Sequence, residues 1–133
     1  MKVILFACAD IAIIDARNNR ASIVNIVEEL SAPGFPAAHP VLNVFALVER
    51  QATEPNKTSA RLRLMFNGQD LVSSNMDIDF QGKMRCRTVA TIQGIIFEKP
   101  GTLKAELRIG RCVSVWTAPV SNLAPPLIAA PLK

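Results

Sequence analysis

The chain contains 133 residues, a length typical of one domain; half of them are hydrophobic and 20% are charged. This composition excludes an intrinsically disordered chain and supplies enough apolar surface for a hydrophobic core. Lys and Arg number 15 against 11 Asp and Glu, and the net charge of +4 is too small to indicate a nucleic-acid-binding protein by itself.

The amino-terminal segment is apolar from Val3 to Ala9, and Asp10 interrupts it. This run is shorter than the apolar core that an export signal needs, and no other segment reaches the length of a membrane-spanning helix. We therefore expect a buried first strand and a cytoplasmic protein that makes no membrane contact.

The three cysteines, Cys8, Cys86 and Cys112, are widely spaced and odd in number. No CxxC pair occurs, and the single histidine, His39, does not complete a Cys/His zinc set. We expect reduced thiols, as is usual in the cytoplasm, and no metal site. A Cys86–Cys112 disulfide stays possible if their strands are neighbours.

The first half of the chain predicts strands separated by turns and one proline-rich loop. β-Branched residues in Ala21–Leu30 favour a strand, although their spacing also fits a helical stripe. Three prolines between Ser31 and Pro40 predict an ordered loop or an edge crossing. The expected strands are residues 3–9, 11–15 after a break near Asp10, 21–30 and 41–49.

The second half shows clearer strand signals. Charged and apolar residues alternate in Arg61–Phe66, and Asn67-Gly68 after it is the strongest hairpin signal in the chain. Leu103–Ile109 alternates in the same way, and Gly110-Arg111 predicts a tight reversal after it. Further strands are expected at residues 71–80, 84–93 and 112–118.

About eight short strands with regularly spaced turns, and no long helix, predict an all-β antiparallel β-sandwich, with a β-barrel as the alternative. We expect this domain to cover residues 1–118. Residues 119–133 are rich in Pro and Ala, and we expect them to form an extended or disordered tail, because proline interrupts regular strand pairing.

Several segments together resemble one known family. They are the opening Met1-Lys2-Val3 with Cys8 and Asp10, the residues 19–26, the proline-rich segment 32–40, and the turn Phe97–Leu103. The resemblance is to a bacterial domain-of-unknown-function family of small β-sandwich proteins, and it covers residues 1 to about 118. It implies a small cytoplasmic β-sandwich and transfers no catalytic residue.

The sequence contains few residues in an arrangement typical of a catalytic site. His39 has no carboxylate or nucleophile beside it in the sequence, and Asp77 and Asp79 share a strand face that reads as exposed. Glycine-rich phosphate loops and the GxSxG and HExxH signatures do not occur. We expect no catalytic residue, no cofactor and no enzymatic activity.

The apolar residues near the carboxyl end favour a different class of function. Trp116 is a residue type enriched at protein interfaces, and an apolar tail tends to be covered by a partner. We therefore expect a non-enzymatic protein-binding or assembly module, acting as a homo-oligomer or with another protein. The expected interface residues are Trp116, Leu123, Leu127 and Ile128.

The alternative is a nucleic-acid or polyanion-binding β-domain. Arginines on neighbouring strands would form a phosphate-binding patch if their faces match. Single-stranded nucleic acid also requires exposed aromatic side chains, whereas most aromatic residues here occupy apolar strand positions. The candidate residues are Arg61, Arg63, Arg85, Arg87 and Arg108.

Overall fold

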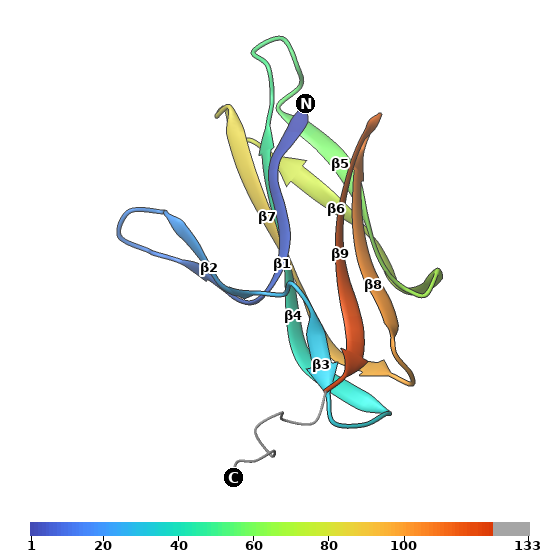
Figure 1. Cartoon of the computed structure of the whole chain (residues 1–133). Coiled ribbons are helices and arrows are strands. Elements are labelled where there is room, and N and C mark those ends of the chain that lie inside the picture. The colour runs from blue at the N-terminus through green and yellow to red at the C-terminus, as the bar shows by residue number, and fades with distance from the viewer. Residues whose placement is uncertain (124–133) are drawn as a thin grey trace.

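The computed structural model describes residues 1–123, which form nine strands and, within that range, no helix (Figure 1). The described part therefore contains no helix long and apolar enough to cross a membrane. The strands are β1 (Lys2–Ile14), β2 (Ala21–Ile26), β3 (Leu30–Ala32), β4 (Ala37–Glu49), β5 (Lys57–Phe66), β6 (Gln69–Asp79), β7 (Arg85–Phe97), β8 (Gly101–Ile109) and β9 (Cys112–Asn122).

The strands form two sheets that pack face to face, which confirms the predicted sandwich (Figure 1). Sheet A has the order β2-β1-β4-β7, and sheet B has the order β3-β9-β8-β5-β6. Neighbouring strands are antiparallel with one exception among the described strands: β3 pairs parallel to β9 at the edge of sheet B.

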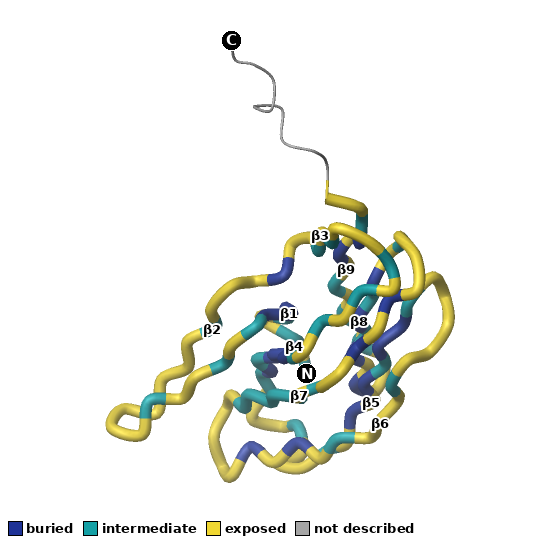
Figure 2. Tube along the Cα trace, turned by 90° about the horizontal axis from the view of Figure 1, so that it is seen from below, coloured by how far each residue is buried: buried dark blue, intermediate teal, exposed yellow. Residues whose placement is uncertain are grey.

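The core lies between the sheets and follows the two-residue repeat of each strand. β4 contributes Leu42, Val44, Ala46 and Val48, and the residues between them face away from sheet B. Figure 2 shows buried positions along the strands of both layers, with exposed positions over β2. Sheet B contributes Ala60, Leu62, Leu64, Ile78, Leu103, Ala105, Leu107, Ile109, Ala118 and Val120.

The turn chemistry is as predicted where glycine or asparagine sets the backbone. Asn67 and Gly68 both have positive φ, 51° and 82°, as a type I′ hairpin turn requires. Gln81 and Gly82 also have positive φ between β6 and β7, and Gly110 has a φ of 57° between β8 and β9. Left-handed backbone at these positions is the reason that each strand reverses within a few residues.

The strand boundaries differ from the prediction in several places. β4 begins at Ala37, inside the predicted proline-rich loop, and β5 and β7 are longer than expected. β1 runs without a break through Asp10, and the predicted single strand 21–30 is divided into β2 and the short β3. β9 continues to Asn122, four residues beyond the expected end of the domain at 118, because its last residues pair with β3. Partners distant in the sequence therefore extend β9 beyond its local strand pattern.

A core substitution tests the packing. Leu64 is fully buried between the sheets, so Leu64→Ala removes apolar contacts and leaves a cavity. We expect the free energy of unfolding to fall by about 2–5 kcal/mol, measured by urea denaturation. Leu71→Ala is the matched control, because Leu71 is 43% exposed, and we expect a change within about 0.5 kcal/mol. Equal losses for the two variants would contradict the packing described.

Candidate functional site

Three of the five candidate arginines lie on the outer face of sheet B. Arg61 of β5 is directly opposite Arg108 of β8, and Arg63 follows two residues later. Acidic side chains neutralise part of this group: Arg63 contacts Asp70 at 2.9 Å and Glu106 at 3.7 Å, and Arg108 approaches the same Glu106 carboxylate at 3.9 Å. These arginines and carboxylates form a cluster of mixed charge rather than a purely basic surface.

The other two arginines lie on β7, in sheet A, and are separated from the first three. Arg85 donates to Glu49 of β4 at 3.0 Å. Arg87 donates to the backbone oxygen of Asn19 at 2.9 Å and also to its side-chain oxygen. The five arginines therefore do not form one patch, because their strands belong to different sheets.

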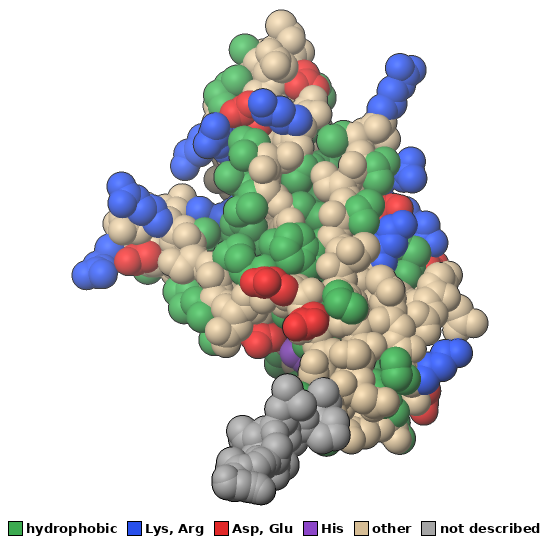
Figure 3. Space-filling view, in the orientation of Figure 1, with side chains coloured by type: hydrophobic (Ala, Val, Ile, Leu, Met, Phe, Trp, Pro, Cys, Tyr) green, Lys and Arg blue, Asp and Glu red, His purple; other side chains and the backbone are tan. Residues whose placement is uncertain are grey.

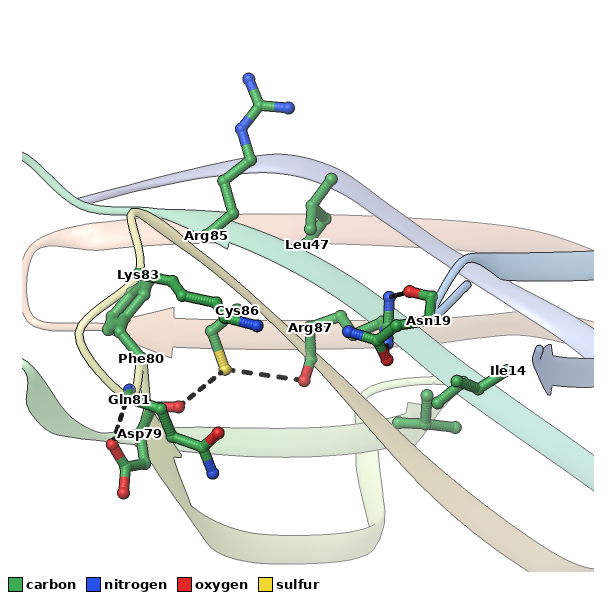
Figure 4. A pocket seen from close by; sticks show the side chains of 11 residues that line it. Ile14, Asn19, Leu47, Asp79, Phe80, Gln81, Lys83, Arg85, Cys86 and Arg87 are labelled. Carbon is green, nitrogen blue, oxygen red and sulfur yellow. Dashed lines mark hydrogen bonds between the residues drawn. The ribbon is translucent and has the colours of Figure 1, made fainter. Parts of the chain in front are cut away.

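A hollow of about 480 Å³ lies between the β1–β2 turn and the β6–β7 turn, and we call it the β6–β7 hollow (Figure 4). Ile14, Leu47, Phe80 and Val89 give it apolar walls. Its polar lining comes from both turns and from β7. The polar lining residues are Asn19, Asp79, Gln81, Lys83, Arg85, Cys86 and Arg87.

Cys86 is the thiol that lines this hollow, and its surroundings favour the protonated form. Its thiol donates to the backbone oxygen of Asp79 at 3.4 Å (Figure 4). Burial raises the pKa of Cys86, and the nearby Asp79 charge also favours the neutral thiol. Arg85 and Arg87 already have partners within the protein, which limits their ability to stabilise a Cys86 thiolate.

His39 has a carboxylate partner that its sequence neighbours did not reveal. Its Nε2 lies 3.0 Å from Oδ1 of Asp10, which joins β4 to β1. Asn43 donates to the backbone oxygen of Asp10 at 2.8 Å and accepts from Thr91 at 2.7 Å. These bonds form a polar network across β1, β4 and β7, which we call the Asp10 network.

The Asp10 network has the orienting half of a catalytic triad but not the nucleophile. Among the described residues no hydroxyl or thiol is hydrogen-bonded to His39. The pocket beside the imidazole has a volume of about 50 Å³, large enough for a water molecule and too small for most substrates. Its geometry fits a structural role.

Trp116 faces the core side of sheet B. Its indole nitrogen donates to the backbone oxygen of Val27 at 2.9 Å, and its ring packs against the core cluster. Trp116 thereby joins β9 to the link between β2 and β3. Leu123 is 61% exposed, whereas Leu127 and Ile128 lie outside the described residues.

The centre of the outer face of sheet A is apolar, although Glu49, Arg85 and Arg87 lie on the same face. Leu5 is opposite Leu47, Ala7 is opposite Phe45, and Phe45 is in turn opposite Val89. Phe45 and Ala7 are buried although they do not belong to the core cluster. The centre of this face therefore resembles the inside of a protein more than an exposed surface.

The β1–β2 hairpin extends this apolar character beyond the sandwich, and we call residues 11–26 the arm (Figures 1 and 2). β1 pairs with β4 only as far as Ala9, so the arm beyond that point is a two-stranded ribbon. Its apolar side chains occupy both faces. The arm residues exposed between 40% and 51% are Ile11, Ile13, Ile14, Val24 and Ile26.

The comparison with protein families agrees with this architecture. A family model described as a family of unknown function (DUF6941) matches residues 4–112. The chain belongs to this family. The resemblance predicted from the sequence to a domain of unknown function is thereby confirmed. A search of the curated proteins found no match.

The DUF6941 match includes the whole arm, the Asp10 network and all five candidate arginines, whereas Trp116 and Leu123 lie beyond it. The sequence prediction missed the arm as a surface. A signal for it was present, because apolar residues occupy consecutive positions in 11–14 and in 23–24. Only Val3–Ala9 was interpreted as a strand covered on both faces, whereas residues 11–14 and 23–24 were predicted as strands without regard to their exposure.

Thiol reactivity tests the surroundings of the cysteines. Burial raises the pKa of Cys8 to about 12, so at pH 8 roughly one molecule in 10⁴ carries the thiolate. We expect iodoacetamide to leave Cys8 unmodified in the folded protein and to alkylate the half-buried Cys112 first, as read by peptide mass spectrometry. Urea-unfolded protein is the control, in which all three cysteines react. Early modification of Cys8 in the native state would contradict its burial.

Proposed function

We propose that this DUF6941 protein is a non-enzymatic protein-binding or assembly module, and that the arm is its binding element. The observation that carries the proposal is the exposure of five Ile and Val side chains on a two-stranded ribbon. An isolated two-stranded hairpin is at best marginally stable in water, and contiguous apolar surface of this kind marks interaction sites.

The alternative classes have less support from the geometry. The arginines divide into two groups, and Glu49, Asp70 and Glu106 neutralise part of each group. The His39–Asp10 pair lacks a bonded nucleophile among the described residues, and Cys86 is held as a neutral thiol. Protein binding needs none of these groups, since it rests on the burial of apolar area.

The proposal includes a reducing compartment such as the cytoplasm. Cys8, Cys86 and Cys112 are all free, and the described chain has no disulfide that would need an oxidising environment. The partner is either another copy of the chain, giving a homo-oligomer, or a different protein. Both readings use the same arm.

Site-specific photo-crosslinking tests the proposal. A benzophenone amino acid at Val24 places the reactive group on the arm, and we expect protein cross-links to form in cells that express the chain naturally. The matched control is Val115, which has a similar exposure of 45% but lies on the outer face of sheet B. We expect several-fold fewer cross-links there. Equal yields at the two positions, or none at Val24, would refute a binding role for the arm.

A further inference from the structure

The free edge of β2 is the first observation that indicates which kind of partner binds the arm. β2 is the edge strand of sheet A and pairs with β1 alone, so one row of its backbone donors and acceptors faces outward. Natural edge strands are protected by charges, prolines or bulges. The six residues Ala21–Ile26 include no charged residue and no proline. Asn25 has a positive φ of 58°, but Val24 and Ile26 on either side of it keep one register with β1, so β2 offers an edge for pairing with another strand.

The charges at the two ends of β2 are the second observation. Arg20 precedes the strand at the tip of the arm, and Glu28 and Glu29 follow it where the arm joins the sandwich. None of the three has an ion-pair partner within the described residues, and all are exposed. Figure 3 shows basic side chains together with an acidic one at the far end of the arm, and acidic side chains near its base.

We propose that this partner is a second copy of this chain, bound by antiparallel pairing of the two β2 strands about a two-fold axis. This inference rests on the proposed protein-binding function and names its partner. The pairing joins two four-stranded sheets into one continuous sheet and places the apolar faces of the two arms side by side. A two-fold axis satisfies both free edges at once, as a closed dimer requires.

The charges select one register for this pairing. When Val24 pairs with Val24 of the second copy, Ser22 is opposite Ile26, and Arg20 is opposite Glu28. Antiparallel pairing brings the basic tip of each arm to the acidic base of the other. Residues directly opposite in a sheet share a face, so the outer faces remain continuous. The two-fold axis repeats the Arg20–Glu28 contact, so each dimer contains it twice.

Sedimentation velocity of the full chain tests the existence of the dimer. The chain has a mass of 14.5 kDa, and we expect the measured mass to rise toward twice that value as the concentration is raised from about 1 to 100 µM. A mass that stays at one chain throughout would refute the second copy. If the Val24 probe still captured a different protein, the binding function would stand with another partner.

Charge exchange tests the register. Arg20→Glu and Glu28→Arg each create like-charge contacts in the homodimer, and we expect either to raise the dissociation constant about tenfold or more. A mixture of the two variants contains opposite charges at both contacts, so we expect it to form a heterodimer. The double variant with both changes should dimerise as the original chain does. This cycle separates pairing from misfolding, because restored association requires folded protein.

Lys99→Glu is the matched control for Arg20→Glu, since it makes the same change of charge in the β7–β8 turn, away from β2. We expect it to leave the dissociation constant unchanged. A dimer that persists equally in both single variants, or a mixture that fails to associate, would overturn the proposed register. Dimerisation that appears only after residues 124–133 are removed would show that this segment covers the arm, and would overturn the second copy as its occupant.

Discussion

The Asp10 network lies where the backbone pairing between β1 and β4 of sheet A ends. From Lys2 to Ala9, β1 pairs with β4, and from Ala9 onward it pairs with β2, so the two ladders meet at Ala9. At Asp10 the side chains of β4 replace the ladder, since Asn43 donates to the Asp10 carbonyl and His39 holds its carboxylate. Pro40 of β4 has no backbone donor to continue the pairing. From this point β1 continues with β2 alone, and the arm is the result.

The end of the β1–β4 ladder explains why one side of the protein carries so much apolar surface. β1 pairs with β4 over its first half and with β2 over its second half, and its sequence is apolar in both halves apart from Lys2 and Asp10. Arg87 holds the tip of the arm through Asn19, which fixes the arm relative to β7 and forms the β6–β7 hollow beneath it. The arm is therefore held in place while five of its apolar side chains remain between 40% and 51% exposed.

Much of the fold could be predicted from local sequence, and the site could not. Asn67-Gly68 and the alternation in Arg61–Phe66 specify a hairpin through backbone preference and burial alone, and the structure has both. The grouping of the arginines depends on which sheet receives β7, and the partner of His39 lies 29 residues away. Neither fact has a local signal, because strand order is decided by packing of the whole chain.

The apolar run of β1 shows how the same pattern can have two meanings. Consecutive apolar residues predict a strand covered on both faces, and this holds for Ala7 and Cys8, both buried. At Ile13 and Ile14 the pattern continues, yet both side chains are about half exposed. The hydrophobic effect does not distinguish cover supplied by the same chain from cover supplied by another. The apolar side chains of β1 that remain half exposed therefore indicate burial by a partner protein. The edge of β2 carries no charged residue, which indicates that this partner contributes a strand.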